Sequence, residues 1–284
     1  MTELTEQEID GWVAAALAED VGGGDVTTLA CLPAGSRSRA LLRAREACVV
    51  GGMALAVAAF RHLDANVRTT LRHADGRSVG PGEVLLEVAG HTRALLTAER
   101  VALNFVQRLS GVATLTARYV AAVAGTGARI LDTRKTTPGW RRLEKYAVAC
   151  GGGTNHRMGL HDLVLIKDNH LAALAGAPPN PVAAAVARAR ALYPRLRVEV
   201  EADRLEQVAW AVDAGADIIL LDNMSPEALR AAVARVAGRA RTEASGGVRL
   251  ETVRTIAETG VDFISVGALT HSARAVDLGL DFVD

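Results

Sequence analysis

The first third of the chain alternates between helical and strand-like patterns of apolar residues. Thr5 and Glu8 have the spacing of a capping box, and apolar residues recur at helical intervals after them, so we predict a helix over residues 5–19. Three alternating or apolar runs, separated by glycine-rich turns, predict the strands of a small sheet. These strands are expected at 39–50, 66–72 and 83–88, with a helix at 54–63.

A long helical segment follows, over residues 92–124. Ser110 and Gly111 are poor helix formers, and we expect the helix to be interrupted there. We place the end of a first, mixed α/β domain at this point, so that this domain covers residues 1–112.

The pattern then changes to short apolar runs that alternate with helical stretches. Six runs predict strands, at 129–132, 163–167, 197–201, 217–222, 241–245 and 262–267. Helices are expected between them, among others at 204–214, 225–238 and 249–259. Repeated strand–helix units with apolar strands predict a parallel sheet covered by helices.

Six strands are fewer than the eight of a complete (β/α)₈ barrel, although a further strand could lie within 146–154. A doubly wound sheet is therefore not excluded by the apolar pattern. The polar residues favour the barrel, because each strand ends in polar or glycine residues that its apolar body does not need. In parallel α/β folds the carboxyl ends of the strands meet at one face, which carries the site.

Glycine turns close the last two strands. Ser245-Gly246-Gly247 and Val266-Gly267-Ala268 would each open a helix and present backbone N–H groups, which is typical of a phosphate site. Cationic side chains gather at the ends of other strands, in a chain with only three lysines. They are Arg134, Lys135, His156, Arg157 and Lys167, and their density predicts a second ligand with several anionic oxygens.

Two carboxylates, Glu201 and Asp222, end neighbouring predicted strands. They could hold Mg²⁺ together with ligand oxygens, bind sugar hydroxyls, or form salt bridges to a neighbouring lysine or arginine. On the helix at 92–108, Arg100, Asn104 and Arg108 form one polar stripe, whose ordinary explanation is a solvated face.

Charge and composition exclude several classes of protein. Lys and Arg total 32 and so do Asp and Glu, so no overall field attracts nucleic acid or anionic lipid. We see no membrane span and no signal peptide, and we expect a cytoplasmic protein with no membrane or nucleic-acid partner. The three cysteines are widely spaced and the histidines lack metal-ligand spacing, which argues against a disulfide framework and a zinc site.

A set of motifs along nearly the whole chain resembles the quinolinate phosphoribosyltransferase family. The motifs are TAERVALN at 97–104, LSGV at 109–112, DTRKTTPG at 132–139, EKY at 144–146, GGGTNHR at 151–157, IKDNH at 166–170, LLDN at 220–223, EASGG at 243–247 and SVGALTH at 265–271. Their order and spacing match the family as well as their residues do.

The resemblance implies an N-terminal α/β sandwich domain (1–112) followed by an incomplete, about seven-stranded α/β TIM-like barrel (113–272). The tail at 273–284 could pack back on the first domain. The resemblance also implies a homodimer in which Arg100 reaches the partner's active site.

The family's site residues map onto positions that the strand ends had already selected. Quinolinate would contact Arg100, Thr133, Arg134, Lys135, His156, Arg157 and Lys167. The phosphoribosyl group and its phosphates would contact Lys167, Glu201, Asp222, Ser245, Gly246, Gly247, Ser265, Val266, Gly267 and His271. Lys135, Glu201 and Asp222 would be catalytic, with Mg²⁺ as cofactor held by Glu201 and Asp222.

The implied reaction joins quinolinate to 5-phosphoribosyl-1-pyrophosphate and releases nicotinate mononucleotide, pyrophosphate and CO₂, a step of NAD biosynthesis. Two alternatives stay open at this point. One is a phosphoribosyltransferase for another aromatic acid, such as nicotinate, which would need fewer cations. The other is a non-catalytic barrel that binds phosphorylated metabolites, against which the intact acidic pair argues.

Overall fold

The computed structural model describes residues 3–283, so Met1, Thr2 and Asp284, which belong to the expected first domain and tail, lie outside the described residues. The chain forms two compact units, and neither is continuous in sequence. The first unit contains the chain up to Ala117, then Thr137–Gly152 and the segment from Ser272 onward. The second unit contains Arg118–Thr136 and Gly153–His271.

The helices of the first unit begin with α1, and its predicted capping box is confirmed. Thr5 Oγ1 accepts a hydrogen bond from the backbone N–H of Glu8 at 3.2 Å, and the Glu8 carboxylate accepts one from the N–H of Thr5 at 2.8 Å. The helices are α1 (Glu6–Val21), α2 (Val26–Cys31), α3 (Met53–Leu63), α4 (Thr92–Ala122), whose last turn belongs to the second unit, and α5 (Arg141–Cys150).

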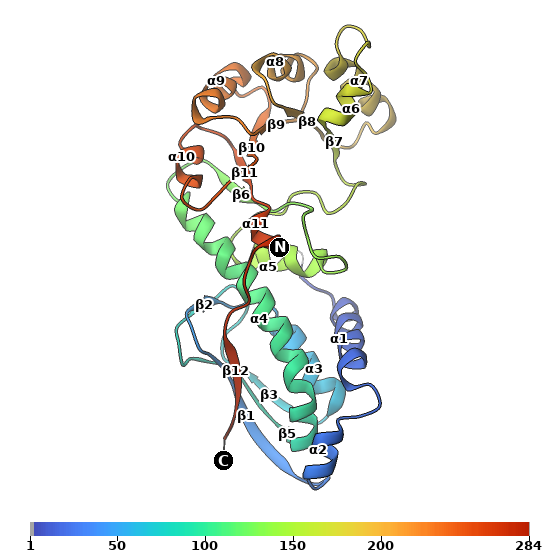
Figure 1. Ribbon diagram of the computed structural model, residues 1–284, viewed down its shortest axis with the longest axis vertical. Coiled ribbons are helices and arrows are strands. Elements are labelled where there is room, and N and C mark those ends of the chain that lie inside the picture. Colours follow the sequence, from blue (N-terminus) through green and yellow to red (C-terminus); the bar gives the residue numbers. More distant parts are fainter. Residues whose placement is uncertain (1–2, 284) are drawn as a thin grey trace. The chain divides into compact units, whose positions relative to one another are not determined.

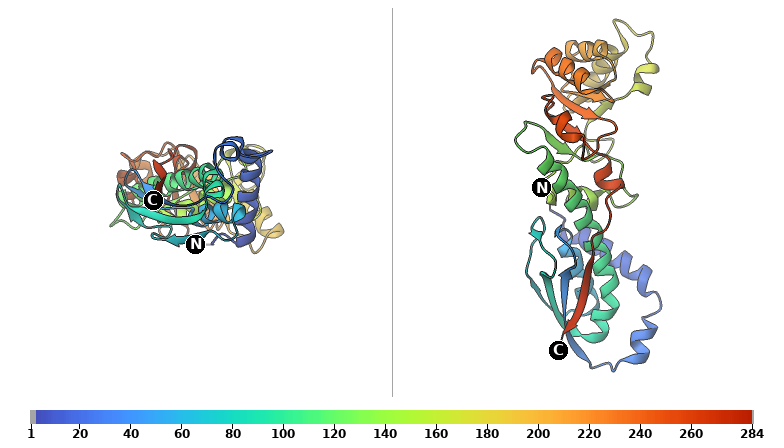
Figure 2. Two further views of the ribbon diagram at one scale, coloured as in Figure 1. Left: turned by 90° about the horizontal axis from the view of Figure 1, so that it is seen from below. Right: turned by 60° about the vertical axis from the view of Figure 1, so that its left-hand side comes forward.

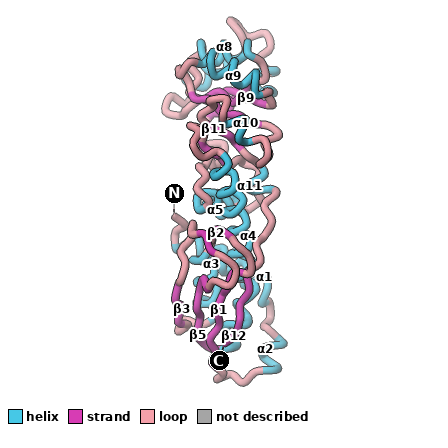
Figure 3. Tube along the Cα trace, turned by 90° about the vertical axis from the view of Figure 1, so that its left-hand side faces the viewer, coloured by secondary structure: helices cyan, strands magenta, loops and turns pink. Residues whose placement is uncertain are grey.

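The sheet of the first unit has four antiparallel strands in the order β12-β1-β5-β3, which Figure 3 shows side by side. These strands are β1 (Arg37–Ala44), β3 (Arg68–Leu71), β5 (Val84–His91) and β12 (Leu278–Val283), and a separate pair is formed by β2 (Cys48–Val49) and β4 (Ser78–Val79). The three predicted strand regions are confirmed. Strand β12, from the opposite end of the chain, pairs with β1 from Arg39↔Val283 to Ala44↔Leu278.

Helix α4 is continuous through Ser110 and Gly111, so the predicted interruption is wrong. Gly111 is there because of packing: a Cβ atom on it would lie 2.0 Å from the backbone oxygen of Arg274. The glycine lets the C-terminal segment pass close to the helix, and the buried neighbours of α4 outweigh its low helix propensity.

The second unit is built on six parallel strands in the order β6-β11-β10-β9-β8-β7. All six were predicted. They are β6 (Arg129–Leu131), β7 (Val164–Ile166), β8 (Val198–Ala202), β9 (Ile218–Asp222), β10 (Arg241–Ser245) and β11 (Phe263–Ser265). The helices of this unit are α6 (Asp168–Ala172), α7 (Pro181–Leu192), α8 (Leu205–Asp213), α9 (Pro226–Val236), α10 (Val253–Ala257) and α11 (Ala268–His271). In Figures 1 and 2, α8, α9 and α10 lie on the outer side of the strands.

The strand order identifies an incomplete barrel. The first strand of this unit, β6, pairs with the last, β11, as in a barrel, whereas a doubly wound sheet reverses its order at an inner strand. Where a seventh strand is expected, the structure has an isolated parallel bridge between Thr154 and Leu131. Most of the segment 146–154 belongs instead to α5, and the barrel is open between this bridge and β7.

The strand bodies provide the core of the second unit. Val198 and Val200 in β8 and Ile219 and Leu221 in β9 are fully buried. Because side chains alternate along a strand, Glu199 and Glu201 lie on the opposite face of β8 from these valines.

None of the helices among residues 3–283 combines the length and apolar character of a membrane span.

Candidate active site

The carboxyl ends of the barrel strands line a cavity of about 700 Å³. It brings together Thr133, Arg134, Lys135, His156, Arg157, Lys167, Glu201, Asp222, Ser245, Gly246, Gly247 and Ser265 from the set of predicted site residues. Asp132, Asp168, Asn223 and Glu243 also line it, although the sequence analysis did not assign them to the site.

Four predicted residues do not line this cavity. Gly267 lies beside it, since a Cβ atom there would be 3.0 Å from Cδ of Lys135 and 3.1 Å from Nε2 of His271. Val266 is buried directly before Gly267. Arg100 belongs to the first unit, where it is exposed on α4.

The polar stripe on α4 divides into two kinds of residue. Arg108 has a structural role, because its guanidinium forms a 2.8 Å ion pair with the buried Glu144. Arg100 and Asn104 are exposed, as a solvated face requires.

The glycine turn after β10 is shaped by its neighbours. Gly246 has φ 92° and Gly247 has φ 59°, both in the left-handed region that favours glycine. A Cβ atom on Gly246 would lie 2.1 Å from Oδ1 of Asn223. We predicted that this turn opens a helix, and that is wrong, because α10 begins only at Val253. The same prediction for the second turn is confirmed, because α11 follows Gly267 directly.

Two half-buried arginines lie close together in the cavity wall. Burial lowers the pKa of Arg157, and the charge of Arg134 lowers it further. Within residues 3–283, the buried Nε of Arg134 has no hydrogen-bond partner, and neither guanidinium has a carboxylate within ion-pair distance. Two such cations repel each other, and an anion placed between them would relieve that repulsion.

The acidic pair lies at the ends of β8 and β9. Lys167 Nζ and Glu201 Oε2 form a 2.8 Å ion pair. The amide of Asn223 donates to Oδ2 of Asp222 at 2.6 Å. Burial raises the pKa of Asp222, and the nearby charge of Glu201 raises it further. These carboxylates therefore gain from an added cation.

The loop that carries His156 and Arg157 is fixed to the end of β6. Asp132 is fully buried, and its carboxylate accepts hydrogen bonds from the backbone N–H of His156 at 2.9 Å and from the side-chain amide of Asn155 at 2.6 Å. The bridge between Leu131 and Thr154 holds the start of the same loop. The buried carboxylate of Asp132 therefore fixes the position of this loop relative to β6.

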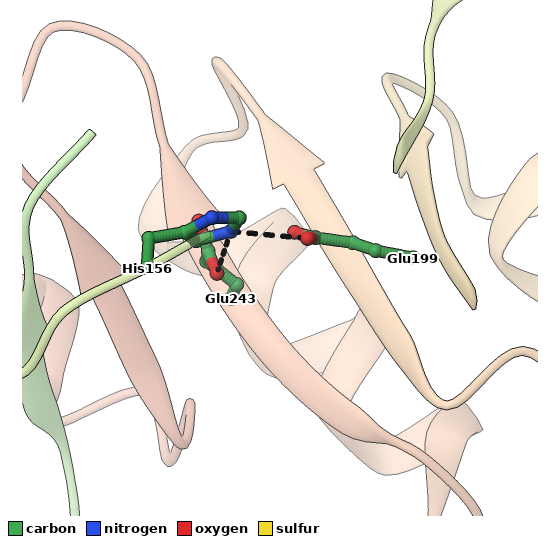
Figure 4. A group of neighbouring side chains, drawn as sticks. All are labelled: His156, Glu199 and Glu243. Carbon is green, nitrogen blue, oxygen red and sulfur yellow. Dashed lines mark ion pairs between the residues drawn. The ribbon is translucent and has the colours of Figure 1, made fainter. Parts of the chain in front are cut away.

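Below His156, two buried carboxylates face its imidazole ring (Figure 4). Nε2 lies 3.0 Å from Oε2 of Glu199 and 3.4 Å from Oε2 of Glu243, and both glutamates are at most 1% exposed. Burial by itself lowers the pKa of His156, but hydrogen bonding and the charges of both glutamates bring it above its usual range. Burial raises the pKa of Glu199.

The other ring nitrogen of His156 limits that rise. Nδ1 accepts a 2.7 Å hydrogen bond from the backbone N–H of Arg157, so a second ring proton on Nδ1 would face another donor. The ligand atoms of His156, Glu199 and Glu243 lie within 4.8 Å of one another, as a metal site requires. A metal on Nε2, however, needs the ring proton on Nδ1, where the Arg157 N–H group already lies.

The sequence analysis placed Glu199 within a predicted strand (197–201) and Glu243 within the EASGG motif, and it assigned neither to the site. A signal for Glu199 was present, because V-E-V-E places Glu199 and Glu201 on one face of a strand. Glu243 lies opposite Leu220 in the neighbouring strand, a register that the sequence does not reveal.

The fold and site define a phosphoribosyltransferase-like α/β barrel, and comparison with known proteins identifies the family. Residues 25–110 match the N-terminal domain of quinolinate phosphoribosyl transferase, and residues 112–281 match its C-terminal domain. The chain belongs to the quinolinate phosphoribosyltransferase family.

Curated relatives and solved structures agree with this assignment. The chain is 45% identical to the nicotinate-nucleotide pyrophosphorylase (carboxylating) of Mycobacterium leprae, over 95% of each chain. It is 43% identical to a probable enzyme of that name in Bacillus subtilis, over 93% of this chain and 89% of the relative. The crystal structure of NadC from Streptococcus pyogenes matches all of both chains with a TM-score of 0.94 and 42% identity.

Human nicotinic acid phosphoribosyltransferase is a more distant structural match. It is 15% identical, with a TM-score of 0.64 over 99% of this chain and 75% of that chain. At that identity the match shows a shared fold and does not bear on the substrate.

Proposed function

We propose that the cavity at the carboxyl ends of the barrel strands carries out the reaction of this family. The reaction transfers the phosphoribosyl group of 5-phosphoribosyl-1-pyrophosphate to the ring nitrogen of quinolinate. It releases pyrophosphate and CO₂ and leaves nicotinate mononucleotide, in NAD biosynthesis. The observation that carries this placement is the pair of neighbouring arginines, Arg134 and Arg157, without a carboxylate partner in the described chain.

Quinolinate is pyridine-2,3-dicarboxylate, so two anionic groups lie side by side on its ring. Arg134 and Arg157 would each bind carboxylate oxygens, with Thr133 and Lys135 on the same cavity wall. Holding both carboxylates fixes the direction of the ring nitrogen, which converts a bimolecular encounter into a positioned attack on the sugar C1. A monocarboxylate would leave part of the cationic charge without a partner.

The sugar substrate would lie across the other side of the cavity. Its 5-phosphate suits the turn at Ser245–Gly247, where glycine leaves the backbone open, and Ser265, Gly267 and His271 lie at the next strand end. Lys167 would meet the pyrophosphate, in exchange for part of its pairing with Glu201.

Glu201 and Asp222 are suited to hold Mg²⁺. They offer carboxylate oxygens, which this ion prefers. Burial and the charge of Glu201 raise the pKa of Asp222, so an added cation would stabilise its ionised form. When bound, Mg²⁺ would neutralise charge on the pyrophosphate leaving group. The two carboxylates also face the positive charge that develops at C1 as the bond to pyrophosphate breaks.

Loss of CO₂ needs no base. After glycosylation the ring nitrogen is cationic and accepts the electron pair of the breaking C–C bond. A site with little water favours this step, because the departing carboxylate loses its hydration.

Arg100 would complete the site of a second copy of the chain in a homodimer. It is exposed on α4, and within residues 3–283 it has no ion pair.

We place the protein in the cytoplasm, with the two substrates as its small-molecule partners.

Substrate kinetics test the arginine pair. Arg157→Ala should raise KM for quinolinate by about 30-fold or more, since a charged partner contributes about 2 kcal/mol, and leave KM for the sugar substrate near its original value. Wild-type turnover should require quinolinate and should not occur with nicotinate. Turnover with nicotinate alone, or an unchanged KM for quinolinate in Arg157→Ala, would contradict the proposed placement.

A further inference from the structure

His156 uses both of its ring nitrogens inside the protein. Nδ1 accepts the backbone N–H of Arg157 at 2.7 Å, and Nε2 faces the carboxylates of Glu199 and Glu243 (Figure 4). A neutral imidazole has one donor and one acceptor. Because Nδ1 is the acceptor, the ring proton lies on Nε2 and points to the carboxylates. This arrangement leaves no ring nitrogen for a carboxylate of the substrate.

We propose that His156 is a positioning residue, which Glu199 and Glu243 hold in place and which in turn fixes the backbone of Arg157. Arg157, rather than the imidazole, is then the direct partner of a quinolinate carboxylate. This inference rests on the placement of quinolinate proposed above, and it gives His156 a different role from the one the family resemblance implies.

The contacts of Arg157 support this role. Its guanidinium makes one long hydrogen bond, 3.4 Å to the backbone oxygen of Leu163, and has no carboxylate ion pair within residues 3–283. The charged end of the side chain is therefore only weakly held by the protein, which leaves it available to bind a ligand. Its position depends on its backbone, which Nδ1 of His156 holds at 2.7 Å and which Asp132 steadies one residue earlier.

The burial of the two glutamates supports the same role. Both are almost fully buried, and within residues 3–283 neither oxygen of Glu199 nor Oε2 of Glu243 has a partner with good hydrogen-bond geometry. A buried carboxylate is costly unless a donor or cation lies beside it, and Nε2 of His156 lies 3.0 and 3.4 Å from these two. Their attraction to the imidazole keeps the ring in one orientation. His156, Arg157 and Glu243 also line a second cavity, of about 240 Å³. Because packing does not enclose the ring on that side, its orientation depends on the two carboxylates.

The first test is NMR of the wild-type enzyme with ¹⁵N-labelled histidine. We expect Nε2 of His156 to be protonated and Nδ1 to be unprotonated, both in the free enzyme and at saturating quinolinate. Loss of this pattern on binding quinolinate, with Nδ1 becoming protonated or Nε2 losing its proton, would overturn the inference. Because the wild-type protein is used, folding of a variant does not enter.

The second test compares two conservative variants. In His156→Asn the side-chain oxygen can take the place of Nδ1 and accept the Arg157 N–H, whereas in His156→Gln the amide can take the place of Nε2 and leaves that N–H without an acceptor. We expect His156→Asn to keep KM for quinolinate close to wild type, and His156→Gln to raise it about fivefold to tenfold, the effect of one hydrogen bond. KM for the sugar substrate should not change in either. The reverse ranking would overturn the inference.

The third test addresses the glutamates. Glu199→Leu should raise KM for quinolinate about tenfold, and Glu199→Gln, which keeps an oxygen that can accept from Nε2, should recover most of that loss. Glu206→Gln, on the exposed side of α8, is the matched control. Melting curves identify any variant that does not fold.

The outcomes separate this inference from the proposed function. An unchanged KM for quinolinate in Arg157→Ala would remove the proposed placement of the substrate. A raised KM in Arg157→Ala, together with wild-type kinetics in both His156→Gln and Glu199→Leu, would leave the placement intact and remove the positioning role.

Discussion

At the scale of single residues, the site depends on residues whose neighbours leave them one conformation. Gly246 is the sharpest case, since it combines a φ of 92° with a position where a Cβ atom would lie only 2.1 Å from Oδ1 of Asn223. Asp132 is a second case, since it is fully buried and its carboxylate accepts the backbone N–H of His156.

Gly246→Ala should lose most turnover while the barrel stays folded. The new methyl group would displace Asn223, whose amide holds Asp222, so both the phosphate turn and the acidic pair would move. A shift of about 1 Å at a catalytic group costs about 100-fold in rate.

Steady-state kinetics and a melting curve check this prediction, and Gly238→Ala is a matched control. Gly238 also has positive φ, at 74°, but a Cβ atom on it would meet nothing within 4 Å, and it lies outside the cavity. Equal activity in both variants would mean that the turn has no part in the site.

Sequence predicts residue roles best where a residue type has few structural uses. The cationic cluster could be predicted because the carboxyl ends of parallel strands meet at one face, so cations that follow several strands lie together. Glu199 and Glu243 could not be assigned, because their role depends on the register of β8, β9 and β10 and on a loop from a distant part of the chain.

At the scale of elements, helices and strands with a strong apolar periodicity could be predicted, whereas close contacts between segments distant in sequence could not. The six parallel strands and α1 have unmistakable patterns. The continuity of α4 at Gly111 depends on Arg274, which is more than 160 residues away in sequence, so no local pattern carried it. Strand β12 likewise depends on its tertiary neighbour β1.

An ion pair joins the C-terminal segment to the end of β1. Hydrogen bonds from Arg274 and from the backbone of Asp277 lower the pKa of Glu46 to about 2. A carboxyl whose pKa falls on folding stabilises the fold above its unfolded pKa, near 4.5, and this contribution is lost as pH falls toward 2. We expect Glu46→Gln to reduce stability at pH 6 and to weaken the loss of stability between pH 5 and about 3.

Urea unfolding at several pH values checks this expectation. The effect is small, because Glu46 is partly exposed and solvent screens the pair. Parallel pH profiles for wild type and Glu46→Gln would show that the ion pair does not stabilise the fold.

At the scale of the whole molecule, the proposed dimer makes each site depend on two chains. At a quinolinate concentration near the wild-type KM, Arg100→Ala alone and Arg157→Ala alone should each have little activity. When the two variants are mixed and allowed to exchange subunits, hybrid dimers would contain one site with both arginines intact. Activity should then rise toward about one quarter of wild type, since half of the dimers are hybrids with one working site each.

A mixture that stays as inactive as its components, although native mass spectrometry detects hybrid dimers, would contradict the shared site. The matched control is a mixture of Arg157→Ala with Arg134→Ala. Both substitutions lie in the same cavity wall, so a hybrid contains no intact site.

The pairing of β12 with β1 also concerns how the protein is made. The ribosome releases Arg37–Ala44 long before Leu278–Val283, so an edge of the first unit's sheet stays without its partner until β12 emerges. During that time β1 offers unpaired backbone groups to any other strand, including the same strand of another nascent chain. The emergence of β12, rather than that of β1, β3 and β5, is therefore the point at which the β1 edge of this sheet is protected from aggregation.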